Sequence, residues 1–154
     1  MNDMRIKESA VIEVPIDKVW PYIASPDLRS LFNAKITKCE LISEQVGRIG
    51  SVYTIDFRMG SKITSTRCEI IDLQIGKRIR VKSTISDPSQ STASGTLTYE
   101  LEDLGFKTKV SERSDFVIPE INILGRAIIW LISRFGRPEG ETNLQKLKRI
   151  VEER

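Results

Sequence analysis

The apolar stretch between residues 121 and 135 places the strongest constraint on how this chain folds. Ten of its fifteen residues are apolar, which is more than one face of an amphipathic helix requires. Another part of the protein must therefore cover this segment. Interrupted by Gly125, Arg126 and Arg134, the stretch is shorter than the ~20 apolar residues that a bilayer-spanning helix needs.

A break and a second helical pattern follow this stretch. Residues 136–140 (GRPEG) disfavour a continuous helix, and apolar residues then recur at helical spacing. The sequence predicts a C-terminal helix over residues 121–154 that is kinked or split near Pro138. The segment Thr142-Asn-Leu-Gln145 also fits a capping box, which would begin a separate helix at that point.

Seven segments before residue 119 have the pattern of β-strands. The first alternates apolar and polar residues, and the other six are separated by short, turn-like links. Links this short join antiparallel neighbours, because a parallel pair needs a crossover of a dozen or more residues. The predicted strands are Met4–Val14, Ile36–Glu44, Ser51–Met59, Lys62–Leu73, Arg78–Ile85, Ser91–Glu102 and Phe106–Ile118.

Two short helices are predicted between the first two strands. Pro15 ends the first strand, and apolar residues then repeat at helical spacing over 16–23, with Asp17 as a candidate N-cap. Residues 25–27 (SPD) end this helix before a second one of a turn or two. The predicted order is one strand, two short helices, six strands and one long helix.

Composition narrows the range of functions. A chain of 154 residues fits one domain, and its 24 basic and 21 acidic residues are scattered, so we predict no nucleic-acid partner. The chain contains no histidine, and Cys39 and Cys68 lie in separate strands, which excludes the usual zinc sites and His-dependent catalysis. We predict no metal and no cofactor. The first residues lack the apolar run of a secretory signal, so we expect a cytoplasmic protein with reduced thiols.

Four segments of the chain resemble a known superfamily. They are residues 11–27 (VIEVPIDKVWPYIASPD), 50–53 (GSVY), 95–102 (GTLTYELE) and 143–152 (NLQKLKRIVE). With the element order, they resemble the Bet v 1-like helix-grip superfamily, also called START-like or SRPBCC, over essentially the whole chain. The sequence is most similar to its polyketide cyclase/dehydrase and lipid-transport group, with some similarity to a family of membrane-associated accessory proteins of carbon monoxide dehydrogenase.

This resemblance implies an α+β helix-grip fold, in which a seven-stranded curved antiparallel sheet closes around a long C-terminal helix. It also implies a cavity between the sheet and that helix for a hydrophobic or amphipathic small molecule, lipid- or polyketide-like. The fold hosts binding proteins and enzymes alike, so it does not decide whether this chain is an enzyme. No catalytic residue carries over by a motif match.

Strand parity indicates which side chains face the predicted cavity. We take the more apolar face of each strand, together with the helix residues that would point toward it. Apolar alternation marks burial, and it does not distinguish a packed core from a pocket wall. The candidate ligand-binding residues are Trp20, Leu31, Phe32, Tyr53, Ile55, Phe57, Ile79, Val81, Leu97, Tyr99, Phe116, Leu124, Ile128 and Leu131.

Two glutamates fall on the apolar faces of their strands. Glu8 lies in the first strand and Glu112 in the last, and these strands are neighbours in the resembled fold. A carboxylate facing the cavity is a candidate general acid or base. The alternative is that a bulge reverses the facing of these residues, or that they meet Arg or Lys near an open end of the sheet. For Arg67, parity gives no answer, because both faces of its strand carry apolar residues.

The C-terminal helix has apolar residues to spare. If its other apolar residues face the sheet, Ile123 and Trp130 lie on the opposite side, where loops, a membrane surface or a second copy of the chain would cover them. Three functions are therefore open. They are binding of a hydrophobic small molecule, catalysis of the polyketide cyclase/dehydrase type through cavity carboxylates, and a membrane-associated accessory role.

Overall fold

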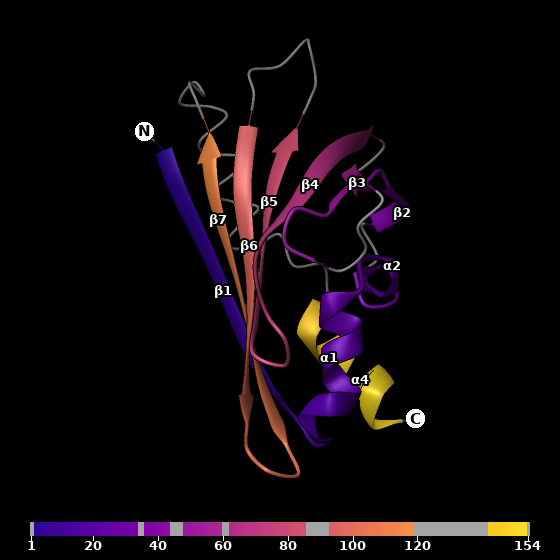
Figure 1. Cartoon of the computed structure of the whole chain (residues 1–154), viewed down its shortest axis with the longest axis vertical. Helices are drawn as coiled ribbons and strands as arrows, with labels where there is room; N and C mark the ends of the chain where they lie inside the picture. The colour runs from indigo at the N-terminus through magenta and orange to yellow at the C-terminus, as the bar shows by residue number, and fades with distance from the viewer. Residues whose placement is uncertain are drawn as a thin grey trace.

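The computed structural model describes residues 2–33, 36–43, 48–59, 62–85, 93–118 and 142–153. Seven strands and three helices lie in these ranges, and the helices share one side of the sheet (Figure 1). The elements are β1 (Asn2–Ile12), α1 (Ile16–Ala24), α2 (Pro26–Arg29), β2 (Ile36–Leu41), β3 (Val52–Met59), β4 (Lys62–Gln74), β5 (Arg78–Ile85), β6 (Ala93–Asp103), β7 (Thr108–Ile118) and α4 (Asn143–Glu152).

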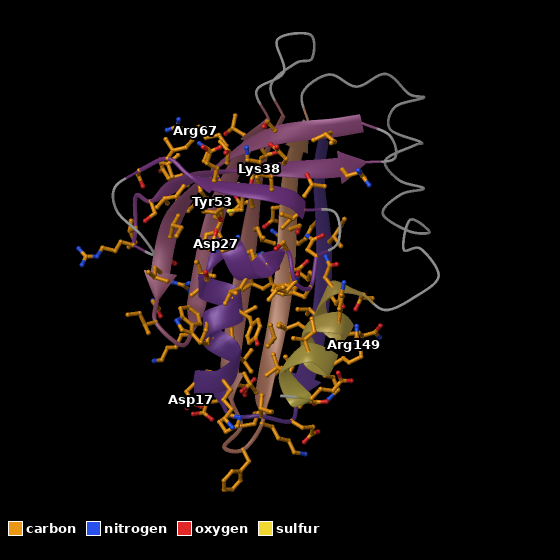
Figure 2. The ribbon with its side chains drawn as sticks, turned by 90° about the vertical axis from the view of Figure 1, so that its right-hand side faces the viewer. Asp17, Asp27, Lys38, Tyr53, Arg67 and Arg149 are labelled. Atoms are coloured by element: carbon orange, nitrogen blue, oxygen red, sulfur yellow. The ribbon has the colours of Figure 1, made fainter. Side chains whose placement is uncertain are left out.

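The strands form one antiparallel sheet in the order β1-β7-β6-β5-β4-β3-β2. β1 pairs with β7, so the predicted neighbourhood of the first and last strands is confirmed. Viewed from the side, the violet and magenta strands β2 to β4 run across the upper ends of the orange strands β6 and β7 (Figure 2). The sheet therefore bends around its helices, and the predicted α+β fold with a curved seven-stranded sheet is confirmed.

A bulge in β4 explains why parity gave no answer for Arg67. Thr66, Cys68 and Ile70 are buried, whereas Arg67 is exposed. The pairing of β4 with β5 then shifts between Ile70 and Asp72, which adds one residue to β4. An extra residue reverses the facing of all that follow, so apolar residues appear on both faces of the strand in sequence.

The hydrophobic core lies between the concave face of the sheet and the helices. α1 contributes Val19 and Ile23, and α4 contributes Leu144, Leu147 and Val151, all buried. These positions follow the three- and four-residue spacing that places side chains on one helix face. The sheet contributes Ile12, Ile36, Tyr53, Ile55, Cys68, Ile70, Ile79, Val81, Tyr99, Leu101 and Val110.

The predicted ends of three elements need correction. β1 ends at Ile12, two residues before the predicted Val14, because the chain bends ahead of Pro15. Pro15 is itself the N-cap of α1, so Asp17 lies in the first turn and does not cap the helix through its side chain. β7 begins at Thr108, and Phe106 lies in the preceding turn with 88% of its surface exposed.

The capping-box alternative for the C-terminal segment is confirmed. Thr142 has extended backbone angles, its hydroxyl accepts a hydrogen bond from the Gln145 amide, and the Gln145 side chain accepts one from the Thr142 amide. α4 therefore begins at Asn143 as a helix of its own. Residues 119–141 lie outside the described residues, and with them the predicted long apolar helix, including Leu124, Ile128 and Leu131.

α4 is fixed to β1 by polar contacts as well as by its apolar face. They are the hydrogen bonds from Thr142 Oγ1 to Glu8 Oε1, from Lys148 Nζ to the Val11 carbonyl (2.9 Å), and from the Glu13 amide to Glu152 Oε1 (2.7 Å). Among the described helices, none has the length and apolar character that crossing a bilayer requires.

We predict that Thr142→Ala lowers the free energy of unfolding by about 1 to 3 kcal/mol, because it removes both the helix cap and the donor to Glu8. Thr142→Ser keeps the hydroxyl and is the matched control. Urea unfolding followed by circular dichroism measures both variants. Equal stability of the alanine and serine variants would contradict the proposed dual role of this hydroxyl.

Candidate functional site

The concave face of the sheet carries the predicted interior residues in two neighbouring rows. Residues directly opposite one another on paired strands point to the same face. One row contains Glu8, Glu112, Tyr99 and Ile79, and the next contains Ile6, Ser114, Leu97 and Val81. The structure thus brings together Ile79, Val81, Leu97 and Tyr99, as predicted, on the side covered by α1 and α4.

The other predicted ligand-binding residues divide by exposure. Tyr53, Ile55 and Phe32 are buried and Trp20 is half-buried against the core. Leu31 is 41% exposed, which places it outside the buried face. Phe57 and Phe116 lie in β3 and β7, but their side chains, like Leu124, Ile128 and Leu131 and the proposed contact residues Ile123 and Trp130, lie outside the described parts.

Arg29 at the end of α2 is the residue that the sequence analysis missed. Only 3% of its surface is exposed. Its Nη1 donates a hydrogen bond of 2.8 Å to the Tyr53 hydroxyl, and its Nη2 donates one of 3.2 Å to the Ile23 carbonyl. The guanidinium carbon also lies 5.6 Å from the centre of the Tyr99 ring, within the range of a cation–π contact.

Two features of the sequence place Arg29 there. Pro26 occupies the first turn of α2, where its fixed backbone angle favours a helix start, and the helix lasts for a single turn. Arg29 is in the last turn, where a cation interacts favourably with the helix dipole. A cation at the end of a polar four-residue helix ordinarily points to solvent, so the local sequence gave no signal of its burial.

Electrostatics around Arg29 keep it charged and keep the tyrosines protonated. Burial alone would lower the pKa of Arg29, but interactions with Tyr53 and Tyr99 reverse this and raise it above its ordinary value. Burial raises the pKa of Tyr53 to about 12, an effect that Arg29 partly offsets. Burial and a hydrogen bond with Glu112 raise the pKa of Tyr99 well above its ordinary value. At neutral pH, the group is one cation among neutral phenols.

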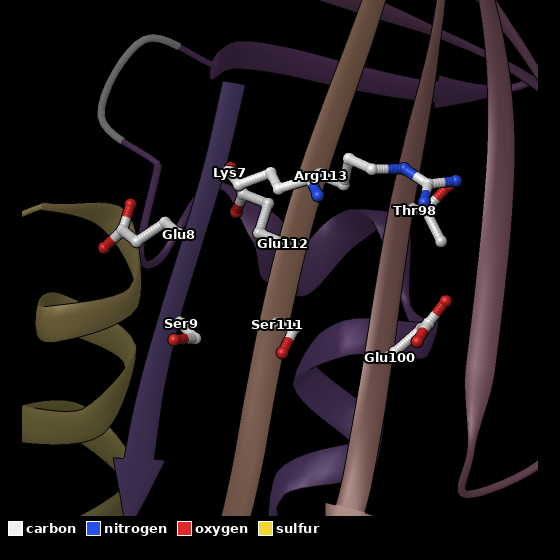
Figure 3. A pocket seen from close by; sticks show the side chains of 8 residues that line it. All are labelled: Lys7, Glu8, Ser9, Thr98, Glu100, Ser111, Glu112 and Arg113. Carbon is white, nitrogen blue, oxygen red and sulfur yellow. The ribbon is translucent and has the colours of Figure 1, made fainter. Parts of the chain in front are cut away.

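Glu8 and Glu112 lie directly opposite each other on β1 and β7. The register of these strands runs without a shift from Asn2 to Ile12, so the bulge that would have reversed their facing is not present there. Glu112 interacts with Tyr99, and Glu8 accepts a hydrogen bond from Thr142, reaching past the edge of β1 toward α4 (Figure 3). Their environments differ: Glu112 belongs to the tyrosine group, and Glu8 holds the C-terminal helix.

The outer face of the same strands has an open hollow of about 370 Å³ (Figure 3). Most of its lining residues have the opposite parity to the concave-face rows, so they point away from the core. Lys7 and Arg113 extend across this surface, with Glu100 below them. The residues around the hollow are Lys7, Glu8, Ser9, Thr98, Glu100, Ser111, Glu112 and Arg113. This lining is polar and of mixed charge, unlike the apolar cavity that the sequence predicts.

The cysteines do not form a reactive or metal-binding pair. Both are free, and burial together with nearby Asp27 raises the pKa of the Cys39 thiol to about 11. Burial also raises the pKa of Cys68, whose sulfur lies 3.6 Å from the Ser83 hydroxyl. Within the described ranges, no group of three or more His, Cys, Asp or Glu residues is placed to hold a metal ion.

A sequence profile identifies the family. The profile described as "Polyketide cyclase / dehydrase and lipid transport" matches residues 3–152. The chain belongs to this family. No curated protein sequence matches the chain.

Solved structures show which folds this polyketide cyclase/dehydrase and lipid-transport family member resembles. The Zhui aromatase/cyclase from a Streptomyces species has a TM-score of 0.75 at 15% identity, over 99% of this chain and 96% of that one. Norcoclaurine synthase from Thalictrum flavum has a TM-score of 0.66 at 13% identity, over 99% and 86%. Ara h 8.0201 has a TM-score of 0.65 at 12% identity, over 99% and 100%. At these identities the likeness establishes the shared fold alone.

The raised pKa of Tyr53 predicts a loss of stability at alkaline pH. The folded protein holds the phenol proton more tightly than the unfolded chain, whose tyrosines ionise near pH ~10. The stability that this proton contributes is complete below pH ~10 and is lost as the pH rises through about 12. Urea unfolding over this range measures the decline, and Tyr53→Phe is expected to flatten it. Ionisation of Tyr53 near pH ~10 in the intact protein would contradict the assignment.

Proposed function

We propose that this protein binds a hydrophobic or amphipathic small molecule against the concave face of its sheet. Membership of the polyketide cyclase/dehydrase and lipid-transport family supports a ligand of this class. One structural neighbour is named an aromatase/cyclase and another a synthase, so the fold is shared with proteins that handle small molecules. The proposal places the ligand between the strands β1, β7 and β6 and the C-terminal part of the chain.

The observation that carries this proposal is incomplete burial in the middle of the concave face. Ile79 and Val81 are fully buried, whereas Leu97, Ser114 and Ile6 in the adjoining positions of β6, β7 and β1 remain half-buried. These three residues form one continuous cross-strand row. Apolar surface left partly open on the inner face of a sheet gains ~25 cal/mol per Å² when a ligand covers it.

We predict that Leu97→Trp weakens binding of the neutral apolar dye Nile red by roughly tenfold or more, because the larger side chain fills the space the ligand would occupy. Val11→Trp adds the same side chain to the outward, exposed face of β1 and is expected to leave the affinity unchanged. Fluorescence titration measures both, and native mass spectrometry of the purified protein detects a molecule retained from the host. Equal affinities in the two variants, or no binding by the wild type, would reject the concave-face site.

A second candidate function is cyclisation or dehydration of a polyketide-like substrate. The contact between Tyr99 and Glu112 favours it, because both reactions need a group that removes a proton and a group that returns one. Arg29 lies against the same tyrosine and would stabilise negative charge developing on a substrate oxygen. In this arrangement Glu112 is the candidate acid or base, and Glu8, bound to Thr142, is a positioning residue.

This candidate predicts that Glu112→Gln lowers the rate of cyclisation of a synthetic poly-β-ketone thioester by roughly a hundredfold or more, since it removes the acid–base group. Nile red affinity is expected to stay unchanged. Glu100→Gln, on the outward face of the adjacent strand, is the matched control with wild-type turnover. Product formation is followed by mass spectrometry. Full activity in the Glu112 variant, or no product with the wild type, would exclude this function.

A further inference from the structure

The buried guanidinium of Arg29 has no negative partner within the described residues. Its hydrogen-bond and ring contacts there are all neutral: the Tyr53 hydroxyl, the Ile23 carbonyl and the Tyr99 ring. Its Nε–H is also buried and makes no hydrogen bond to these parts of the chain. A buried cation without a counter-charge costs several kcal/mol, and proteins ordinarily pair such a group or expose it.

The surroundings of Arg29 hold its guanidinium in one orientation. The hydroxyl of Tyr53 and the carbonyl of Ile23 each accept from a different terminal nitrogen, and the Tyr99 ring covers the planar group. Two of the five N–H donors are therefore fixed by protein acceptors, and the Nε–H is left for another acceptor. This is the arrangement of a prepared site for an oxyanion, because guanidinium edges match carboxylate and phosphate oxygens.

Tyr53 adds a second donor at the same place. Its oxygen accepts from Arg29, and its own O–H proton has no acceptor among the described residues. Because the pKa of Tyr53 is raised to about 12, this proton stays on the phenol throughout the neutral range. An oxyanion beside Arg29 would therefore receive one charge-assisted hydrogen bond from Nε and one from the Tyr53 hydroxyl.

The position of this pair relates it to the proposed binding face. Tyr53 pairs across strands with Cys68, and Tyr99 pairs with Ile79, so the guanidinium lies over the buried part of the concave face. The half-buried row of Ile6, Ser114 and Leu97 begins beside Tyr99. A ligand lying on that row would reach Arg29 with one end.

We infer that Arg29 and Tyr53 bind the carboxylate of an amphipathic ligand whose apolar part lies along the concave face. This inference rests on the proposed binding function and names its ligand class: apolar molecules that end in a carboxylate. A monoanion balances the single charge of Arg29. A phosphate monoester carries up to two charges and would also lie near the Glu112 carboxylate, which contacts Tyr99 and repels additional negative charge.

The test compares dodecanoate with dodecanol, which share an apolar chain and differ in the head group. At pH ~8 the acid is ionised, and we expect wild-type protein to bind it roughly 10- to 100-fold more tightly than the alcohol, as measured by displacement of Nile red. Arg29→Met should abolish this preference while leaving the alcohol and Nile red affinities unchanged. Arg29→Lys should retain part of it, because the charge remains and the planar fork is lost.

Two further variants separate anion binding from structural effects. Tyr53→Phe removes one proposed donor and keeps the cation, so it should reduce the acid preference without abolishing it. Arg67→Met removes an exposed cation from the outer face of β4 and should change nothing. Should Arg29→Met fail to fold, the wild-type comparison and the Tyr53→Phe variant still decide the question.

The outcomes distinguish this inference from the function on which it rests. Equal wild-type affinity for the acid and the alcohol overturns the carboxylate site, while the binding function stands. Loss of acid, alcohol and Nile red binding together in a folded Arg29→Met variant also overturns it and assigns Arg29 a structural role. If dodecyl phosphate binds more tightly than dodecanoate, the carboxylate assignment is wrong. If no apolar probe binds to the wild type, both proposals fall.

Discussion

The pairing of β1 with β7 is the constraint on which the rest of the structure depends. These are the first and last of the described strands along the chain, and their register is continuous over the full length of β1. Bringing them together closes a long loop, whose entropic cost must be met by burial of the concave face. Once formed, the pair sets Glu8 opposite Glu112 and provides the surface on which α4 docks.

The same pairing links the interior to the C-terminal helix. Thr142 caps α4 and donates to Glu8, so one side chain on β1 fixes where that helix begins. On the neighbouring strand, Glu112 contacts Tyr99, whose ring covers Arg29. Polar groups on an apolar face are costly unless each finds a partner, and here they form a connected set at one end of the core. This concentration of polar groups separates a functional interior from a merely packed one.

Membership of the family and the shared fold leave the chemistry to the individual site. The structural neighbours include a cyclase and a synthase by name, yet these and Ara h 8.0201 are at most 15% identical to this chain. A fold of this kind supplies a curved apolar wall, and a few polar residues decide what is held against it. In this chain, the distinguishing residues are a buried arginine, two tyrosines and a glutamate.

The sequence by itself determined the element order, the antiparallel sheet and the inward facing of most strands. It could do so because alternation, short links and helical spacing are local properties. Ile79, Val81 and Tyr99 lie where parity predicted, and the capping box at Thr142 marks a true helix start. The α4 boundary needed the observed backbone angles to choose between two local signals.

Tertiary structure alone decided the rest. The bulge after Ile70 left Arg67 undecided by parity, because one inserted residue reverses every side chain beyond it. Arg29 looked like a surface cation, since its burial depends on Tyr53 and Tyr99, which lie on strands far along the chain. The different environments of Glu8 and Glu112 likewise follow from partners on other elements. Local pattern records which face a residue prefers, whereas its charge environment is set by the segments that fold against it.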